Sequence, residues 1–272
     1  MNAHSVRVLD VRFDRLTTEK LLRTLEVWMT EERTRLITTP NSEMLVLARN
    51  DSSFRSVLNE SDLAVPDAIG VVYAAAAESG ASLARHPGVN TLHEIVRLAH
   101  VQGKRVLLFG GNPGSAERAA THLEHKHPGL VVRGYDPGRV RFDANGNVHV
   151  GREALEYIDT FKPDVLAVAL GHKKQETFMM EYKDRLETVR IAIGIGGALE
   201  MVGGERMRAP EWMQKRGLEW VWRVSIEPAR WKRIFTASIV FPCIVGYHCL
   251  KQGHFFKSSR RVLPVVWKHI SK

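Results

Sequence analysis

Cysteine is scarce in this chain of 272 residues: Cys243 and Cys249 are the two present, and they form no CxxC pair. Two cysteines near the end of the chain exclude a disulfide framework and fit a reducing cytoplasm. The first residues, MNAHSVRVLDVRFDRL, alternate apolar with charged side chains and lack a continuous apolar core. We therefore expect no signal peptide.

Negative charge is missing from the C-terminal end. Residues 228–272 contain nine of the 39 Lys and Arg residues and none of the 30 Asp and Glu residues. The 30 remaining basic residues balance the acidic ones, so the net charge of +9 belongs to this end alone. A basic, aromatic segment can meet nucleic acid or an anionic membrane surface.

A long hydrophobic run is also missing. The longest apolar stretch, IFTASIVFPCIVGYHCL, covers 17 residues (234–250) and is interrupted by Pro242, Gly246 and His248. A membrane span needs about 20 apolar residues. Basic and aromatic residues flank the stretch, which favours a membrane partner over nucleic acid and predicts a peripheral position on the cytoplasmic face of the inner membrane. The alternative is a core helix followed by a basic end. An exposed apolar segment would also favour a homo-oligomer.

Strand-like and helix-like segments alternate through the first three quarters of the chain. Apolar, β-branched runs, each followed by a turn and most of them by a helix-like stretch, occupy residues 6–13, 35–39, 61–65, 104–111, 130–135, 164–171 and 190–197. This alternation predicts an α/β fold with a doubly wound, mainly parallel, Rossmann-like sheet. From about Met207 the period is helical. We expect an α/β catalytic domain (1–206), an Arg/Trp-rich helical appendage (207–234) and a basic apolar tail (235–272).

Polar residues stand at the predicted strand ends, where parallel sheets bind ligands. In RLITTPNSEML, Pro40 biases Thr39 away from helical dihedrals, so Thr39 and Asn41 can project from the sheet edge. Asn41 or Ser42 can cap the next helix, but a cap needs only one side chain. Asp67, in LAVPDAIG, follows a strand and is either a helix cap or a general base.

Glycine turns follow other strands. The turn in VLLFGGNPGSAE, with Gly110, Gly111, Asn112 and Gly114, lets backbone N–H groups approach a phosphate, although it matches neither GxGxxG nor the Walker spacing. Tyr135 and Asp136 end the next strand, where a Rossmann acid would contact a ribose. LGHKKQE places Gly171, Gln175 and Glu176 at a helix start, and GIGGALE contains Gly196, with close strand–helix packing as its alternative.

Three arginines of the appendage have helical spacing. Arg223, Arg230 and Arg233 are seven and three residues apart, so they share one helical face. Such a face is either solvated or, if it folds over the sheet edge, suited to grip a diphosphate.

Six segments together resemble the WecG/TagA/CpsF family of bacterial glycosyltransferases over residues 6–234: TTPNSEM, DLAVPDAIGVVYAA, LLFGGNPGSAE, LGHKKQE, IGIGGALE and RAPEWMQKRGLEWVWRVSIEPARWKR. The resemblance implies an inverting hexosyltransferase that needs neither metal nor cofactor. The donor would be a UDP-sugar carrying N-acetylmannosamine, its uronic acid or glucose. The acceptor would be a saccharide on undecaprenyl diphosphate, in cell-envelope or exopolysaccharide synthesis.

The same resemblance implies roles for individual residues. Asp67 matches the proposed base, Thr39 and Asn41 match a T-x-N pair, and Gln175 matches the glutamine of a KQE motif. Arg223, Arg230 and Arg233 match arginines thought to close over the site at the membrane. The chain departs from the family at His172-Lys173-Lys174-Gln175, which lacks the proline of P-K-Q-E, and at Asn90, which replaces the last Asp of R-x-x-G-x-D.

Two other classes of function remain open on the residues alone. The glycine turn and Asp136 are compatible with an NAD-dependent oxidoreductase, although the glycine fingerprint and an evident hydride-transfer set are missing. A non-catalytic adaptor that binds membrane through the tail would leave the polar strand ends unexplained.

Overall fold

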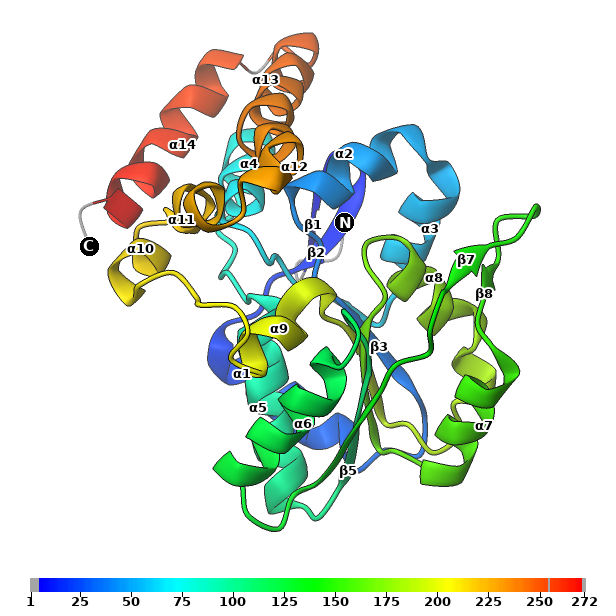
Figure 1. Ribbon diagram of the computed structural model, residues 1–272. Coiled ribbons are helices and arrows are strands. Elements are labelled where there is room, and N and C mark those ends of the chain that lie inside the picture. The colour runs from blue at the N-terminus through cyan, green and yellow to red at the C-terminus, as the bar shows by residue number, and fades with distance from the viewer. Residues whose placement is uncertain (1–4, 254, 271–272) are drawn as a thin grey trace.

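A six-stranded parallel sheet forms the centre of the computed structural model (Figure 1). The structure describes residues 5–253 and 255–270, except for the side chains of residues 215, 223, 230 and 268–270. The strand order is β4-β3-β10-β9-β5-β6, and every neighbouring pair is parallel. The strands are β3 (Arg35–Thr38), β4 (Leu63–Ala64), β5 (Arg105–Gly110), β6 (Val131–Tyr135), β9 (Val165–Ala169) and β10 (Ile191–Gly194).

Helices cover both faces of this sheet, which confirms the predicted α/β class. Alternate residues of a strand point to opposite faces: Val106 and Leu108 of β5 join one core, whereas Leu107 and Phe109 join the other. The first core is closed by α1 (Thr18–Trp28), α5 (Gly88–Val101) and α6 (Ser115–Lys126), and the second by α7 (Arg152–Phe161) and α8 (Lys174–Glu181). Both faces are therefore apolar, as in parallel sheets generally.

The first apolar run does not join the sheet. Residues 6–13 were expected to form one strand before a helix, and this prediction was wrong. The chain instead makes an antiparallel hairpin of β1 (Ser5–Val8) and β2 (Val11–Asp14). It turns at Leu9 and Asp10, whose φ angles are 47° and 66°. A second hairpin, β7 (Arg141–Phe142) with β8 (Val148–His149), follows β6.

A third core lies beside the sheet. It joins β1 and β2 to α2 (Ser42–Asn50), α3 (Ser52–Glu60) and α4 (Ile69–Ser79). The tail packs against this core: α13 (Phe241–Lys251) buries Phe241, Val245 and Cys249, and α14 (Phe255–Ile270) lies against α4 (Figure 1). Part of the tail is therefore a packing element of the body.

In the described part of the chain after β10 the regular elements are all helices, as predicted from the change of period at Met207, with a non-helical stretch at residues 203–210. The chain runs through η2 (Gly196–Ala198), α9 (Leu199–Val202), α10 (Glu211–Lys215), α11 (Glu219–Ile226), η3 (Pro228–Arg230), α12 (Trp231–Phe235) and η4 (Thr236–Val240) into α13 and α14. The stretch Trp231–Lys251 is, by length and composition only, long and apolar enough to cross a membrane: an 18-residue window of it has a mean hydropathy of 1.5, and 17% of that window is buried. The division into a domain, an appendage and a tail stays a prediction.

Candidate active site

A cavity of about 470 Å³ opens at the carboxyl ends of β3, β4, β5, β9 and β10. Parallel α/β sheets bind ligands at this edge. Side chains that follow Val202, including Arg206, Arg208, Glu219 and Arg233, complete the wall. Nine of the residues predicted from the sequence line this one cavity: Thr39, Asn41, Asp67, Gly111, Asn112, Gly171, Gln175, Gly196 and Arg233.

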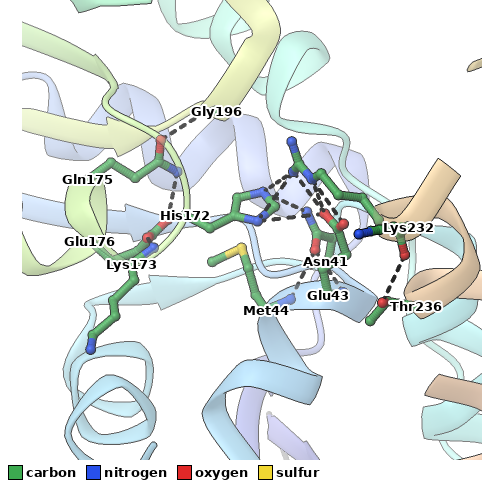
Figure 2. A network of polar contacts seen from close by, with 11 residues as sticks. Asn41, Glu43, Met44, His172, Lys173, Gln175, Glu176, Gly196, Lys232 and Thr236 are labelled. Carbon is green, nitrogen blue, oxygen red and sulfur yellow. Dashed lines mark hydrogen bonds and ion pairs between the residues drawn. The ribbon is translucent and has the colours of Figure 1, made fainter. Parts of the chain in front are cut away.

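The polar turn after β3 combines structural and cavity-facing groups. Thr38 Oγ1 lies 3.0 Å from Ser61 Oγ, and Thr39 Oγ1 donates to the Gly194 carbonyl at 3.0 Å. Asn41 caps α2, because its Oδ1 accepts the N–H groups of Glu43 and Met44 at 3.0 and 3.1 Å. Asn41 is therefore the cap, rather than the alternative Ser42. Its Nδ2 lies 3.3 Å from His172 Nε2 (Figure 2).

Asp67 does not cap α4, the helix that follows it. The N-cap of α4 is Ala68, and no side chain caps that helix. Asp67 Oδ1 instead accepts the N–H of Gly88, the first residue of α5, at 2.7 Å. A Cβ on Gly88 would lie 3.2 Å from Thr39 Oγ1 and 3.7 Å from Asp67 Oδ1, so both side chains flank this glycine. Asp67 is half-buried and oriented, which suits a carboxylate that must meet a substrate.

Gln175 and Glu176 form a buried pair at the start of α8, with exposed fractions of 2% and 1%. Gln175 Oε1 accepts the Gly196 N–H at 3.0 Å, and its Nε2 donates to Glu176 Oε1 at 2.6 Å (Figure 2). A Cβ on Gly194 would lie 2.8 Å from Gln175 Nε2, so a side chain there would displace the Gln175 amide. Burial raises the pKa of Glu176 to about 7.

Arg233 reaches the cavity from the appendage, as the sequence suggested. Its Nη2 and Nε donate to the Glu43 carboxylate at 2.8 and 3.0 Å, and its Nη2 lies 3.4 Å from His172 Nε2. The hydrogen bond from Arg233 to Glu43 raises the pKa of the guanidinium. The side chains of Arg223 and Arg230 lie outside the described part of the chain, so their predicted role stays a prediction.

The glycine turn after β5 reaches the cavity through Gly111 and Asn112. Gly110, Gly111 and Gly114 have φ angles of 99°, 89° and 77°, a region that favours glycine. A Cβ on Gly110 would lie 2.9 Å from the Ala169 carbonyl oxygen, so its lack of a side chain serves strand packing. Around Gly196 no atom lies within 4 Å of such a Cβ, which argues against the close-packing alternative there.

The end of β6 is not brought into the cavity. Tyr135 stacks on Tyr157 with ring centroids 4.3 Å apart, and Asp136 Oδ1 accepts the N–H of Gly138 at 2.9 Å within its own turn. Neither residue lines the cavity, and neither do Gly110 and Gly114. The ribose contact expected from the Rossmann pattern lies outside this cavity and stays a prediction.

Several cavity residues were missed by sequence reasoning. Glu43 has the appearance of a carboxylate that favours a helix N-terminus, and His172 was noted only as a departure from a motif. Arg208 donates to Asn90 Oδ1 at 2.7 Å. Asn90, where the chain departs from R-x-x-G-x-D, therefore contacts a side chain that lines the cavity. Nothing in the local pattern singled out Glu200 or Glu219. Among the residues that the structure describes, no group of three or more His, Cys, Asp or Glu side chains is arranged to hold a metal ion.

Comparison with known proteins gives one family. The model described as "Glycosyl transferase WecG/TagA/CpsF family" matches residues 6–255. A relative from Staphylococcus aureus (strain MRSA252) is 28% identical over 236 residues, 86% of this chain and 88% of that protein. A relative from Bacillus subtilis (strain 168) is 29% identical over 201 residues, 74% of this chain and 75% of that protein. Both are named N-acetylglucosaminyldiphosphoundecaprenol N-acetyl-beta-D-mannosaminyltransferase.

Proposed function

Because the chain belongs to the WecG/TagA/CpsF family of glycosyl transferases, we propose that it moves a sugar from a UDP-sugar to a saccharide carried on undecaprenyl diphosphate, with inversion at the anomeric carbon. The names of the two relatives support an N-acetylglucosaminyl-diphosphoundecaprenol acceptor and an N-acetylmannosamine donor. The uronic acid of that sugar and glucose are the other donors to be compared. The product would enter a cell-envelope or exopolysaccharide polymer.

In the proposed reaction Asp67 is the general base. It removes the proton from an acceptor hydroxyl, whose oxygen attacks the anomeric carbon from the face opposite the nucleotide. The bond between that carbon and the diphosphate oxygen breaks, and UDP leaves with the electron pair. A single displacement needs a base and no enzymic nucleophile, by analogy with inverting hydrolases. The Gly88 N–H that holds Asp67 Oδ1 would keep the carboxylate oriented.

The leaving UDP develops negative charge, which oriented donors can stabilise. Backbone N–H groups at Gly111 and Asn112 and the guanidinium of Arg233 line the cavity and suit this role. The single helix expected through the three arginines is broken at Glu227, between α11 and η3, so Arg223 and Arg230 would join Arg233 from separate elements. The proposed mechanism calls on no metal ion and no cofactor. Thr39, Asn41 and Gln175 would orient the sugar and the acceptor.

One observation carries the proposal: a half-buried carboxylate, Asp67, lines the same cavity as Gln175 and the appendage arginine Arg233. Base, orienting amide and diphosphate-binding cation are the three parts that a metal-free inverting transfer requires. The rival oxidoreductase loses support, because Asp136 does not reach this cavity.

A peripheral position at the cytoplasmic face of the inner membrane would bring the cavity to its lipid-linked acceptor. Fourteen of the 18 large hydrophobic side chains exposed in the described residues lie between Met207 and Trp267, which concentrates apolar surface on the appendage and the tail. Nine positive charges in residues 228–272 would add attraction to anionic lipid. Since α13 buries Phe241, Val245 and Cys249 against the body, we favour shallow contact over a span.

The test is a screen of UDP-sugars for UDP release with a short polyprenyl-diphosphate saccharide as acceptor. We expect one UDP-sugar to be turned over only when acceptor is present. Titration with UDP and with NADH is the companion measurement, and we expect binding of UDP alone. Binding of NADH without UDP, or release of UDP from no UDP-sugar, would sink the proposal.

A further inference from the structure

Glu176 is a buried carboxylate that the proposed mechanism leaves without a role. Its side chain is 1% exposed and lies directly behind Gln175, which faces the cavity. Its Oε1 accepts from Gln175 Nε2 at 2.6 Å, and its Oε2 accepts the Lys173 N–H at 2.8 Å. Lys173 has a φ of 69°, a conformation that is costly for a residue with a side chain. Strained backbone and a buried acid at the same turn indicate a functional constraint.

The contacts of Gln175 fix which end of its amide is which. Its oxygen accepts the Gly196 N–H, and its nitrogen donates to Glu176 (Figure 2). In the flipped orientation the NH₂ group would face the Gly196 N–H, and the amide oxygen would face the carboxylate. Both pairs would then be repulsive, since an amide nitrogen cannot accept and an ionised carboxylate cannot donate. The Gly196 N–H therefore fixes the amide oxygen, and the carboxylate of Glu176, whose two oxygens both accept N–H groups, fixes the amide nitrogen.

We propose that Glu176 is a positioning residue: its ionised carboxylate holds the Gln175 amide in the one orientation that presents a defined N–H and a defined oxygen lone pair to the substrate. This inference rests on the proposed function of the cavity and deepens it. Both oxygens of Glu176 face N–H donors, Oε1 that of Gln175 and Oε2 that of Lys173, so a proton on either oxygen would meet a donor and disturb these contacts. Protonation therefore loosens Gln175, and turnover should rise with pH as Glu176 ionises.

The surroundings make Glu176 responsive near neutral pH. Burial raises its pKa to about 7, although the contacts with Gln175 and Lys173 oppose this. The strands β9 and β10, which pack against α8, carry no titratable side chain between Val165 and Ala169 or between Ile191 and Gly194. These two strands therefore add no titratable group beside Glu176, and the Glu176→Gln comparison separates its titration from that of His172, which lines the cavity.

Charged groups on α8 and the other elements packed against it mostly have partners of their own. These contacts are Lys173 with Asp51, Lys183 with Asp62, Arg35 with Glu31, Arg185 with Asp159, Lys174 with the Val140 carbonyl, Arg55 with the Ala48 carbonyl, and Glu181 with the Val148 N–H. His149 of β8, Glu60 of α3 and Asp184 of the turn η1 (Lys183–Arg185) are not in contact with Glu176 through any of these pairs.

The experiment compares the full-length chain with Glu176→Gln from pH 5.5 to 9, using UDP-sugar and polyprenyl-diphosphate saccharide. At pH 8 we expect kcat/KM of the variant to be lower by about tenfold, the typical effect of losing a hydrogen bond to a charged group. At pH 6 the kcat/KM values of the two proteins should converge. Glu176 of the wild type is then largely protonated, and the glutamine of the variant is also uncharged. UDP affinity should be unchanged within about twofold.

A matched control lies on the same helix. Glu181 also accepts a backbone N–H, from Val148 at 2.8 Å, and burial also raises its pKa, but it lies outside the cavity. Glu181→Gln should therefore retain the wild-type pH profile. If Glu176→Gln fails to fold, Gln175→Ala serves in its place, because it removes the residue through which Glu176 acts. This variant should lose the rise in kcat/KM near pH 7.

A stability measurement keeps this inference separate from the proposed function. Urea unfolding of the wild type, Glu176→Gln, Gln175→Ala and the double variant should show coupling between the two residues at pH 8 that disappears at pH 6. If no UDP-sugar is turned over, the proposed function fails. The pH dependence of the coupling energy between Glu176 and Gln175 still tests whether Glu176 positions Gln175. The inference would be overturned if the ratio of wild-type to Glu176→Gln kcat/KM were the same at pH 6 and pH 8. A coupling energy that does not change with pH would overturn it as well.

Discussion

The two walls of the cavity are built in different ways. The sheet wall, Gln175 with Glu176 and Gly196, is buried and held by hydrogen bonds of 2.6–3.0 Å. The appendage wall, Arg233 with Glu43, joins a guanidinium whose side chain is 48% exposed to a carboxylate 17% exposed. A buried network has one satisfied arrangement, whereas an ion pair whose guanidinium is partly exposed can exchange its partner for another anion. This difference suits a rigid sugar-binding wall opposite an arginine, Arg233, that can exchange Glu43 for the diphosphate of the substrate.

The largest effect is expected at Asp67, between the two walls. Asp67→Asn keeps the shape of the side chain and removes the base, so turnover should fall by about 10²–10⁴-fold. UDP affinity should survive, because the groups proposed to hold the diphosphate are untouched. Steady-state UDP release and a calorimetric UDP titration provide the measurements.

Asp143→Asn is the matched control for that variant. Asp143 accepts backbone N–H groups in the β7–β8 turn and lies outside the cavity, so turnover should stay within about twofold of the wild type, as for most surface substitutions. Near-wild-type turnover in Asp67→Asn would remove Asp67 from the mechanism while leaving the comparison of the walls intact.

The free energy of unfolding should depend on pH, because Glu176 is buried in the sheet wall. The pKa of Glu176 is raised by burial from 4.5 to about 7, so the folded state binds the proton more tightly than the unfolded state. The free energy of unfolding should therefore fall by about 3 kcal/mol as the pH rises from about 4.5 to 7, and then level off. Subtracting the Glu176→Gln urea curve from the wild-type curve at each pH isolates this slope. A difference that is flat across this window would mean that Glu176 is ionised throughout.

Substitutions of the two partners in the appendage wall, Arg233 and Glu43, should have different effects on UDP affinity. Arg233→Ala removes a charge-assisted contact and should weaken UDP binding by about tenfold. Glu43→Gln releases the guanidinium from its competitor, so UDP binding should hold or tighten. Calorimetric UDP titrations of both variants at one salt concentration test this.

Equal loss of UDP affinity in both variants would contradict an exchangeable clamp. It would mean that the ion pair between Glu43 and Arg233 is part of the folded wall, and that the two walls are alike. High salt offers a further check, because it should weaken UDP binding to the wild type and have less effect on Arg233→Ala.

Much of the sheet could be predicted because its strands differ from their surroundings. Residues 164–171 and 190–197 are apolar on both faces, a pattern that a parallel sheet requires. The run 6–13 has the same composition, yet it turns at Leu9 and Asp10 without a glycine or proline to mark the bend. A turn that relies on positive φ at ordinary residues leaves no signal in the pattern.

The site was predictable where it depends on strand ends and not where it depends on tertiary contacts. Asp67 and Gln175 follow strands, and all parallel strand ends meet at one edge. Glu43 could not be recognised, because its partner Arg233 lies 190 residues further along the chain. The cap at Asn41 illustrates both cases: the residue type predicts a cap, but only the fold brings its nitrogen to His172.

A smaller effect is expected on the outer surface of the appendage wall and the tail. Phe256 is 85% exposed and Leu250 is 60% exposed, so replacing both with Ser should leave the fold intact. Binding to anionic liposomes should weaken by about fivefold through lost apolar contact. Val101→Ser, at a side chain 72% exposed on α5, is the control. Unchanged sedimentation with liposomes would assign these side chains to another partner.

The smallest effect is expected at Asp136, the residue that a Rossmann pattern would choose. Its carboxylate accepts the Gly138 N–H in an exposed turn at the end of β6, the edge strand of the sheet, and does not line the cavity. Asp136→Ala should therefore change UDP affinity by less than about twofold. A loss of tenfold or more in a calorimetric titration would place the ribose at β6. The diphosphate would then have to span from the β5 turn toward that edge, away from Arg233, and the appendage wall would lose its role as a clamp.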